Sequence, residues 1–325
     1  MLYKLEKTAF LFALILVLYM PLHIFIAQSA SLITGGLDVW KAGKDIVLFL
    51  VAPAIIFLAY KQKLFSDTLF RRLVILAAVY ATIHLLYLFF DTTDDTYSAI
   101  VASVYNVRVL GFLFLGYVVG AAKNAKQFIK ILLTATVLIA GAVAAFGVAQ
   151  YFLPPDLLTN VGYSEERGVK YLFFIDDRPE LPRVMSTLRD PNSLGAWLIL
   201  PTLLVGYALL KPAVQKKLFV RDFRREVLFV LLGLMLLAQA FTFSRGALIG
   251  LVLSTVTLLY IVTGDRVLSY VKKYYLFFIA LAVLLLFVLF QFKDSAFIQD
   301  FVFHAAVSTN EADPNQKRIM LQQDA

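Results

Sequence analysis

A run of apolar residues from Val227 to Val262 constrains the fold of this chain more than any other feature of its sequence. As one helix the run would be about 54 Å long at about 1.5 Å per residue, whereas the hydrocarbon core of a bilayer is about 30 Å thick. The run therefore predicts two helices, and the polar break between them lies at Thr242 to Gly246. Paired apolar helices of this length are typical of a protein that crosses a membrane repeatedly.

Other apolar runs and the overall composition agree with this prediction. The chain is 61% hydrophobic and 16% charged, whereas a soluble domain is about half apolar and about a quarter charged. The runs do not alternate polar and apolar residues, which argues against a β-barrel. We expect an all-α, polytopic transmembrane helical bundle of about nine spans. The expected spans are Phe10–Ala27, Ile46–Tyr60, Leu73–Phe90, Ser98–Ala122, Ile131–Phe152, a span beginning at Asp190, the two halves of Val227–Val262, and Tyr275–Phe292.

The distribution of Lys and Arg predicts the orientation of these spans. Basic residues gather before the first span and in every second connector after it, most densely between Lys211 and Arg225. Because cytoplasmic loops carry the excess of Lys and Arg, the N-terminus is expected in the cytoplasm. A long loop, residues 153–190 between the fifth and sixth spans, is then external. Residues 1–292 are predicted to form one transmembrane domain, and residues 293–325 to begin a second external loop. The first apolar run also fits a cleaved signal peptide, and this alternative stays open.

Two polar stretches lie at the ends of apolar runs. They place arginines where burying a charge in the bilayer costs free energy. The first runs from Arg183 to Asn192 and includes Arg189, and the second contains Ser244 and Arg245. A guanidinium group binds phosphate through a planar fork of N–H donors. We therefore interpret the two stretches as two walls of one anion-binding site. The alternative is that these arginines only contact lipid headgroups at the membrane surface.

Two further residues of the same region have a structural interpretation beside the functional one. Asp190, followed by Pro191, is a strong helix-start signal, so Asp190 is predicted to cap the sixth span. The Asn192 amide could contact substrate as well, and Ser244 is expected to support Arg245. Pro201 is predicted to kink the sixth span.

Arg108 lies near the centre of the predicted span Ser98–Ala122, too far from either end to reach the headgroups easily. An intramembrane arginine indicates a functional site by default. It could instead pair with a carbonyl group or with a polar side chain such as Asn106 or Gln239.

Several classes of function receive no support. The chain has no cysteine, which excludes disulfides and thiolate chemistry. His23, His84 and His304 show no metal-ligand spacing, so we expect no metal and no cofactor. The basic residues alternate with apolar spans instead of forming one surface, so nucleic acid is not an expected partner.

The two stretches together resemble motifs of the O-antigen ligase and O-antigen polymerase superfamily, which are polytopic bacterial membrane proteins. The matching residues are Arg183, Ser186, Thr187, Pro191 and Asn192 in the first stretch, and Thr242, Ser244, Arg245 and Gly246 in the second. Ser186 stands where glycine is common in that family. The motif resemblance covers about Arg183–Val262, and the hydropathy resemblance covers the whole chain.

The resemblance implies a metal-independent glycosyltransferase at the external face of the bacterial cytoplasmic membrane. Its donor would be a glycan linked to a polyprenyl diphosphate such as undecaprenyl diphosphate, and its acceptor a lipid or another glycan. The implied diphosphate-binding residues are Arg183, Arg189, Arg245, Arg108 and Arg318. Membrane lipids would surround the spans, and a hydrophobic groove between spans would take the carrier lipid.

The resemblance also leaves one departure. In that family a large external loop carries an arginine and a histidine that is thought to act as general base. Arg318 could correspond to the loop arginine, but no histidine follows it in this sequence. The catalytic base is therefore unknown, and the chain is expected to be C-terminally truncated. Two alternatives stay open: a transporter or flippase for an anionic lipid or solute, and a non-catalytic remnant.

Overall fold

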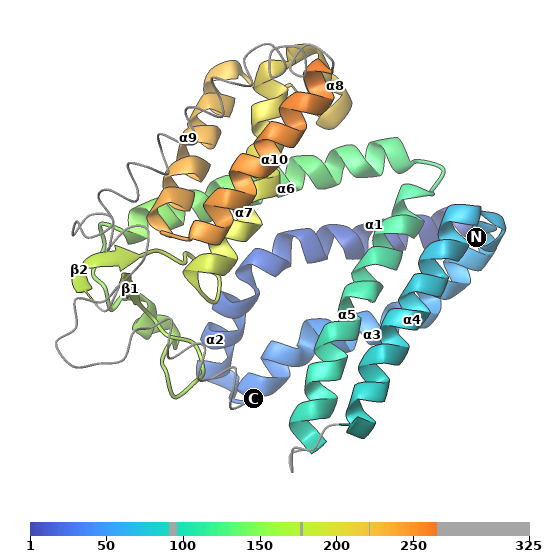
Figure 1. The fold of residues 1–325 in the computed structure, drawn as a ribbon, viewed down its shortest axis with the longest axis horizontal. Helices are drawn as coiled ribbons and strands as arrows, with labels where there is room; N and C mark the ends of the chain where they lie inside the picture. Colours follow the sequence, from blue (N-terminus) through green and yellow to red (C-terminus); the bar gives the residue numbers. More distant parts are fainter. Residues whose placement is uncertain (91–95, 176–177, 221, 265–325) are drawn as a thin grey trace, which may run out of the picture. The chain divides into compact units, whose positions relative to one another are not determined.

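The computed structural model describes residues 1–90, 96–175, 178–220 and 222–264, which are predominantly helical (Figure 1). The helices follow the apolar runs of the sequence, and the long loop between α6 and α7 holds a small antiparallel sheet. The elements are α1 Leu2–Tyr19, η1 Met20–Leu22, α2 His23–Thr34, α3 Leu37–Lys61, η2 Leu64–Ser66, α4 Thr68–Phe90, α5 Thr96–Gly120, α6 Ala125–Gln150, η3 Leu157–Val161, β1 Phe173–Ile175, β2 Arg178–Arg183, α7 Pro191–Leu210, α8 Pro212–Leu218, α9 Arg225–Phe241 and α10 Arg245–Thr263.

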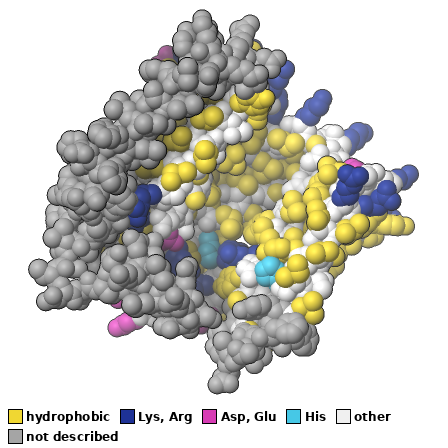
Figure 2. Space-filling view, viewed as in Figure 1, with side chains coloured by type: hydrophobic (Ala, Val, Ile, Leu, Met, Phe, Trp, Pro, Cys, Tyr) yellow, Lys and Arg dark blue, Asp and Glu magenta, His cyan; other side chains and the backbone are white. Residues whose placement is uncertain are grey.

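This is a membrane protein by the length and composition of its helices. Within the described residues, 7 helical segments are long and apolar enough to cross a bilayer. Their outward side chains are apolar as well: Leu50 is 74% exposed and Ile261 72% exposed. Figure 2 shows hydrophobic side chains spread over the helices, with Lys and Arg gathered near the N-terminal end of α1. Exposed apolar surface on this scale needs a lipid environment to cover it.

The predicted helix break in the run Val227–Val262 is confirmed. Helix α9 ends at Phe241 and α10 begins at Arg245, so the break falls where the polar residues are. The first predicted span is longer than expected, because helix continues from Leu2 to Thr34 through the short 3-10 turn at Pro21. The ninth predicted span, Tyr275–Phe292, lies outside the described residues.

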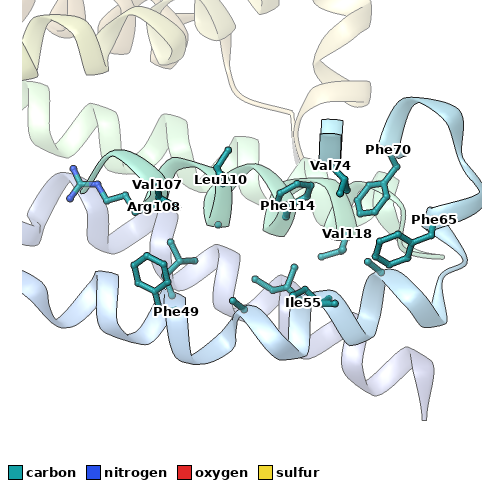
Figure 3. A pocket seen from close by; sticks show the side chains of 15 residues that line it. Phe49, Ile55, Phe65, Phe70, Val74, Val107, Arg108, Leu110, Phe114 and Val118 are labelled. Carbon is teal, nitrogen blue, oxygen red and sulfur yellow. The ribbon is translucent and has the colours of Figure 1, made fainter. Parts of the chain in front are cut away.

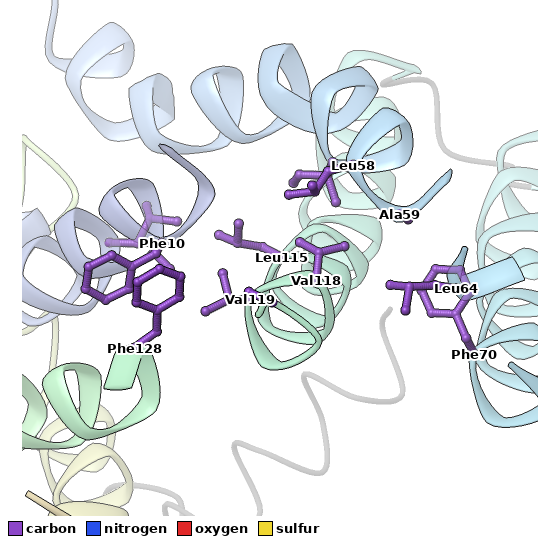
Figure 4. Packing of buried hydrophobic residues seen from close by; sticks show 13 residues of the cluster. Phe10, Leu58, Ala59, Leu64, Phe70, Leu115, Val118, Val119 and Phe128 are labelled. Atoms are coloured by element: carbon purple, nitrogen blue, oxygen red, sulfur yellow. The ribbon is translucent and has the colours of Figure 1, made fainter. Parts of the chain in front are cut away.

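The chain divides into two compact units. The first consists of Met1–Val143 and Ala208–Leu231, and the second of Ala144–Tyr207 and Leu232–Ala325. In the first unit, α3 and α4 both pack on α5, and α1 packs on α5 as well. Its core is a cluster of aromatic and aliphatic side chains, in which the rings of Phe10 and Phe128 stack with centroids 4.2 Å apart (Figure 4).

A buried polar contact fixes one end of this core. Glu6 is only 4% exposed, and its carboxylate accepts hydrogen bonds from the Gln62 side chain at 3.1 Å and from the Lys123 backbone N–H at 3.3 Å. Gln62 also donates to the carbonyl of Val118. Buried charges are tolerated in proteins when they are hydrogen-bonded in this way. The contact ties the first helix to the ends of α3 and α5.

In the second unit, the loop that follows α6 is ordered by a short hairpin. Strand β1 pairs with β2 so that Phe173 lies opposite Arg183. The apolar patch Tyr171–Ile175 of the sequence therefore contributes a strand. The hairpin ends at Arg183, so the chain continues from it directly into the first polar stretch and then into α7.

Candidate anion-binding site

The two stretches singled out in the sequence meet in the second unit. The Nε of Arg183 donates a hydrogen bond to the carbonyl oxygen of Thr242 at 2.9 Å, and its Nη2 donates to Oδ1 of Asn192 at 3.0 Å. The backbone N–H of Val184 also donates to the carbonyl of Phe241 at 3.0 Å. One guanidinium group thus links the end of β2, the start of α7 and the break between α9 and α10.

The backbone of the first stretch is held in an uncommon conformation. Ser186 has φ of +53° and is fully buried. The left-handed region suits glycine and costs other residues free energy, so surrounding contacts must maintain it. The Oε1 of Gln150 accepts hydrogen bonds from the N–H groups of Met185 at 3.2 Å and Ser186 at 2.8 Å. This conformation gives a physical reason why glycine suits this position.

Tyr163 anchors the long loop to the same stretch. Its ring is 1% exposed, and its hydroxyl donates to the carbonyl of Thr187 at 3.2 Å. Burial raises the pKa of the Tyr163 hydroxyl well above its ordinary value of 10.0. The phenol therefore keeps its proton, and with it this hydrogen bond, throughout the physiological pH range.

Two helices begin beside Arg183. Oδ1 of Asp190 accepts from the backbone N–H of Ser193 at 2.9 Å, which confirms the predicted cap of α7. Ser244 is the N-cap of α10, where its hydroxyl accepts from the N–H of Ala247 at 3.4 Å. Since the N-terminal N–H groups of a helix favour anions, the start of each helix adds positive potential to the region.

A glycine allows these two helix starts to approach closely. A Cβ placed on Gly195 would lie 2.6 Å from the Cβ of Ala247 and 3.4 Å from that of Ser244, so any larger residue would force the helices apart. The amide of Gln239 reinforces the contact by donating to the carbonyl of Gly195 at 3.0 Å. The first turns of α7 and α10 therefore pack directly against each other.

The predicted site residues differ in how they are placed. Arg245 is the first residue of α10 and is exposed, beside the buried Ser244 and Thr242. Arg189 is also exposed, just before α7, and lines a separate pocket with residues of the long loop. Arg318 lies outside the described residues. The stretches thus bring Arg183 and Asn192 together with the break that carries Ser244 and Arg245.

Arg108 belongs to the first unit and has partners that were not expected from the sequence. Its Nη1 lies 3.2 Å from Oδ2 of Asp45, and its guanidinium carbon lies 4.6 Å from the ring centre of Tyr105. Lys44 lies 3.0 Å from the same oxygen. Of the polar partners that the sequence suggested, Gln239 lies in the second unit, where its amide donates to the carbonyl of Gly195.

The sequence reasoning missed Asp45 because the second span was predicted to begin at Ile46. Helix α3 instead begins at Leu37, which places Asp45 inside it with only 5% of its surface exposed. The sequence did offer a signal for this pair. Asp45 is an acidic residue next to an apolar run, in a chain that also has an intramembrane arginine, and such residues tend to pair with each other.

An apolar groove extends from Arg108 along the first unit. It has a volume of about 420 Å³ and is lined by residues of α3, η2, α4 and α5, with Arg108 at one end and Phe65 and Phe70 at the other (Figure 3). A groove between spans was expected from the resemblance, and this one is large enough for part of a lipid chain. Within the described residues, no group of three or more His, Cys, Asp or Glu is arranged to hold a metal ion.

No family model, curated protein or solved structure matches this chain.

Proposed function

We propose that this chain is a membrane glycosyltransferase of the O-antigen ligase or polymerase type. It would move glycan from an undecaprenyl diphosphate-type carrier to a lipid or glycan acceptor at the external face of the bacterial cytoplasmic membrane. The observation that carries the proposal is the link that Arg183 makes between Thr242 and Asn192. Arg183 and Thr242 are 59 residues apart in the sequence. Contact with lipid headgroups alone would not require the two motifs to meet around one cation.

The chemistry of the donor fits the groups at this position. When the bond between the glycan and its carrier breaks, negative charge develops on the diphosphate leaving group. Fixed cations and N–H dipoles stabilise that charge without a metal ion. Arg245 and the first turns of α7 and α10 would supply this stabilisation. Arg183 would keep the two polar stretches in contact with each other. We assign none of these residues the role of general base.

Arg108 is left out of the proposed diphosphate site. Its guanidinium is already engaged by the carboxylate of Asp45 and the ring of Tyr105 within the first unit. Arg189 is left out as well, because it lines a separate pocket with residues of the long loop.

A carrier for an anionic lipid or solute is the second candidate, and the Lys44–Asp45–Arg108 group supports it. Ionisable residues within spanning helices often mark transport paths. Oδ2 of Asp45 contacts two cations, and the buried Oδ1 has no hydrogen-bond partner among the residues that the structure describes. A carrier would be expected to move its substrate across the membrane, whereas a transferase would use a substrate that has already crossed.

The surface polysaccharide of cells that lack this gene distinguishes the two candidates. We expect a gel of extracted polysaccharide to lose its polymeric or lipid-capped bands, and the unused lipid-linked glycan to accumulate at the external face. Periodate that cannot cross the membrane would oxidise this accumulated glycan in intact cells. The wild-type gene should restore the bands.

Two results would count against the transferase. Protection of the accumulated glycan from periodate until the cells are permeabilised would favour the carrier. An unchanged band pattern would contradict both candidates.

A further inference from the structure

A second cavity lies in the long loop of the second unit, next to the proposed diphosphate site. This loop pocket has a volume of about 440 Å³, within the range of small-molecule sites. Its polar lining consists of Glu165, Lys170, Arg189 and Asp190, and the half-buried ring of Phe173 adds an aromatic face. Neither the sequence motifs nor the proposed diphosphate site accounts for Glu165, Lys170 and Phe173.

The charges of the loop pocket balance. Glu165 and Lys170 form an ion pair of 3.0 Å, and Asp190 and Arg189 contribute one further charge of each sign. A pocket with two carboxylates and two cations gives no net attraction for a phosphate group. It instead offers hydrogen-bond acceptors and donors side by side, which suits a neutral ligand with many hydroxyl groups. An aromatic ring in such a pocket can cover the C–H face of a sugar.

The framework of the loop pocket is fixed rather than loose. Ser164 pairs with Val169 in an isolated β-bridge, and the turn between them is closed at Gly168, whose φ is +72°. Val169 is 3% exposed and Tyr163 1% exposed, so the residues at both ends of this turn are buried in the second unit. A preorganised pocket loses little conformational entropy when it binds a ligand.

Two backbone connections place the loop pocket beside the two motifs. Phe173 lies directly opposite Arg183 in the β1–β2 pair, and directly opposed residues point to the same face of a sheet. Asp190 of the pocket lies two residues before Asn192, which accepts from Arg183. A sugar attached to a diphosphate near Arg183 would therefore have the loop pocket within reach of its first ring.

We propose that the loop pocket is a glycan subsite that binds a pyranose ring through its hydroxyl groups, next to the diphosphate-binding residues. This inference depends on the proposed transferase function and adds the recognition of sugar to it. The pyranose could belong to the donor or to the acceptor, because both present the same hydroxyl chemistry.

The test measures lipid binding and transfer with the full chain in nanodiscs. One probe is the glycan-bearing carrier extracted from cells that lack the gene, and the other is undecaprenyl diphosphate without sugar. Glu165→Ala is the variant, and Glu166→Ala is the matched control, because both glutamates are exposed and only Glu165 lines the pocket. Loss of hydrogen bonds to a charged group should weaken binding of the glycan-bearing carrier by about 10-fold or more. Binding of undecaprenyl diphosphate should not change.

Each outcome decides a separate point. Weaker binding of the glycan-bearing carrier alone assigns the pocket to the donor sugar. Unchanged carrier binding with a raised KM for the acceptor assigns it to the acceptor sugar. If Glu165→Ala behaves like Glu166→Ala in both measurements, the subsite is wrong while the transferase stands. If the wild-type protein binds neither carrier, the proposed function fails, and the subsite fails with it.

Discussion

Replacing Arg245 by alanine should lower the rate of glycan transfer by about 10²- to 10³-fold, the usual effect of removing one group that stabilises developing negative charge. Arg245 is exposed and begins α10, whose cap is supplied by Ser244. The substitution should therefore leave the helix and the contact between α7 and α10 in place. Transfer would be measured with purified protein in liposomes, from a lipid-linked donor to its acceptor.

Arg225→Ala is the matched control for this prediction. Arg225 is the first residue of α9 as Arg245 is the first residue of α10, and its guanidinium lies 5.5 Å from the ring centre of Phe229. If arginines at these helix starts only reach the lipid headgroups, the two alanine variants should have equal and small effects. Arg245→Lys should retain part of the activity, because it keeps the charge and loses the fork of N–H donors. Nearly full activity of Arg245→Ala would remove Arg245 from the proposed site.

Replacing Asp45 by leucine should have the largest effect on stability, about 3–5 kcal/mol, because it leaves the buried Lys44 side chain and the half-buried Arg108 side chain without their counter-charge. Asp45 is 5% exposed and accepts contacts from Arg108 at 3.2 Å and Lys44 at 3.0 Å. Without the carboxylate, two positive charges would face each other inside a helical unit. The measurement is the unfolding transition of the detergent-solubilised protein, followed by thermal or denaturant titration.

Asp38→Leu controls for the removal of an acidic residue from the same helix. Asp38 lies in the first turn of α3 and is exposed, so its loss should cost only about 0.3–1 kcal/mol through the helix dipole. The double variant Asp45→Leu with Arg108→Met should be more stable than Asp45→Leu alone, because it removes one unpaired cation. Equal unfolding transitions for Asp45→Leu and Asp38→Leu would show that the ion pair contributes little.

The sequence predicted those features that depend on local patterns. The helix break at Thr242 to Gly246 followed from the length limit of a spanning helix, and the cap at Asp190 followed from the Asp-Pro pair. Both signals are contained within a few neighbouring residues. The presence of several long apolar helices was predictable for the same reason.

Features that depend on distant partners were not predictable in this way. Asp45 and Arg108 are 63 residues apart, and Gln150 and Ser186 are 36 apart. Gln150 ends an apolar helix, and nothing in the neighbouring sequence marks it as an acceptor for two backbone N–H groups. The left-handed backbone of Ser186 also had no signal of its own, because serine carries none of the bias that glycine has for that conformation.

The affinity of the full chain for undecaprenyl diphosphate, compared with undecaprenyl monophosphate, tests the diphosphate site most directly. We expect the wild-type protein in nanodiscs to bind the diphosphate about 10-fold more tightly or better, since the second phosphate adds charge-assisted hydrogen bonds. Arg245→Ala should lose most of that preference, and Arg225→Ala should keep it. Equal affinity of the wild-type protein for the two lipids would contradict a site built around Arg183 and Arg245.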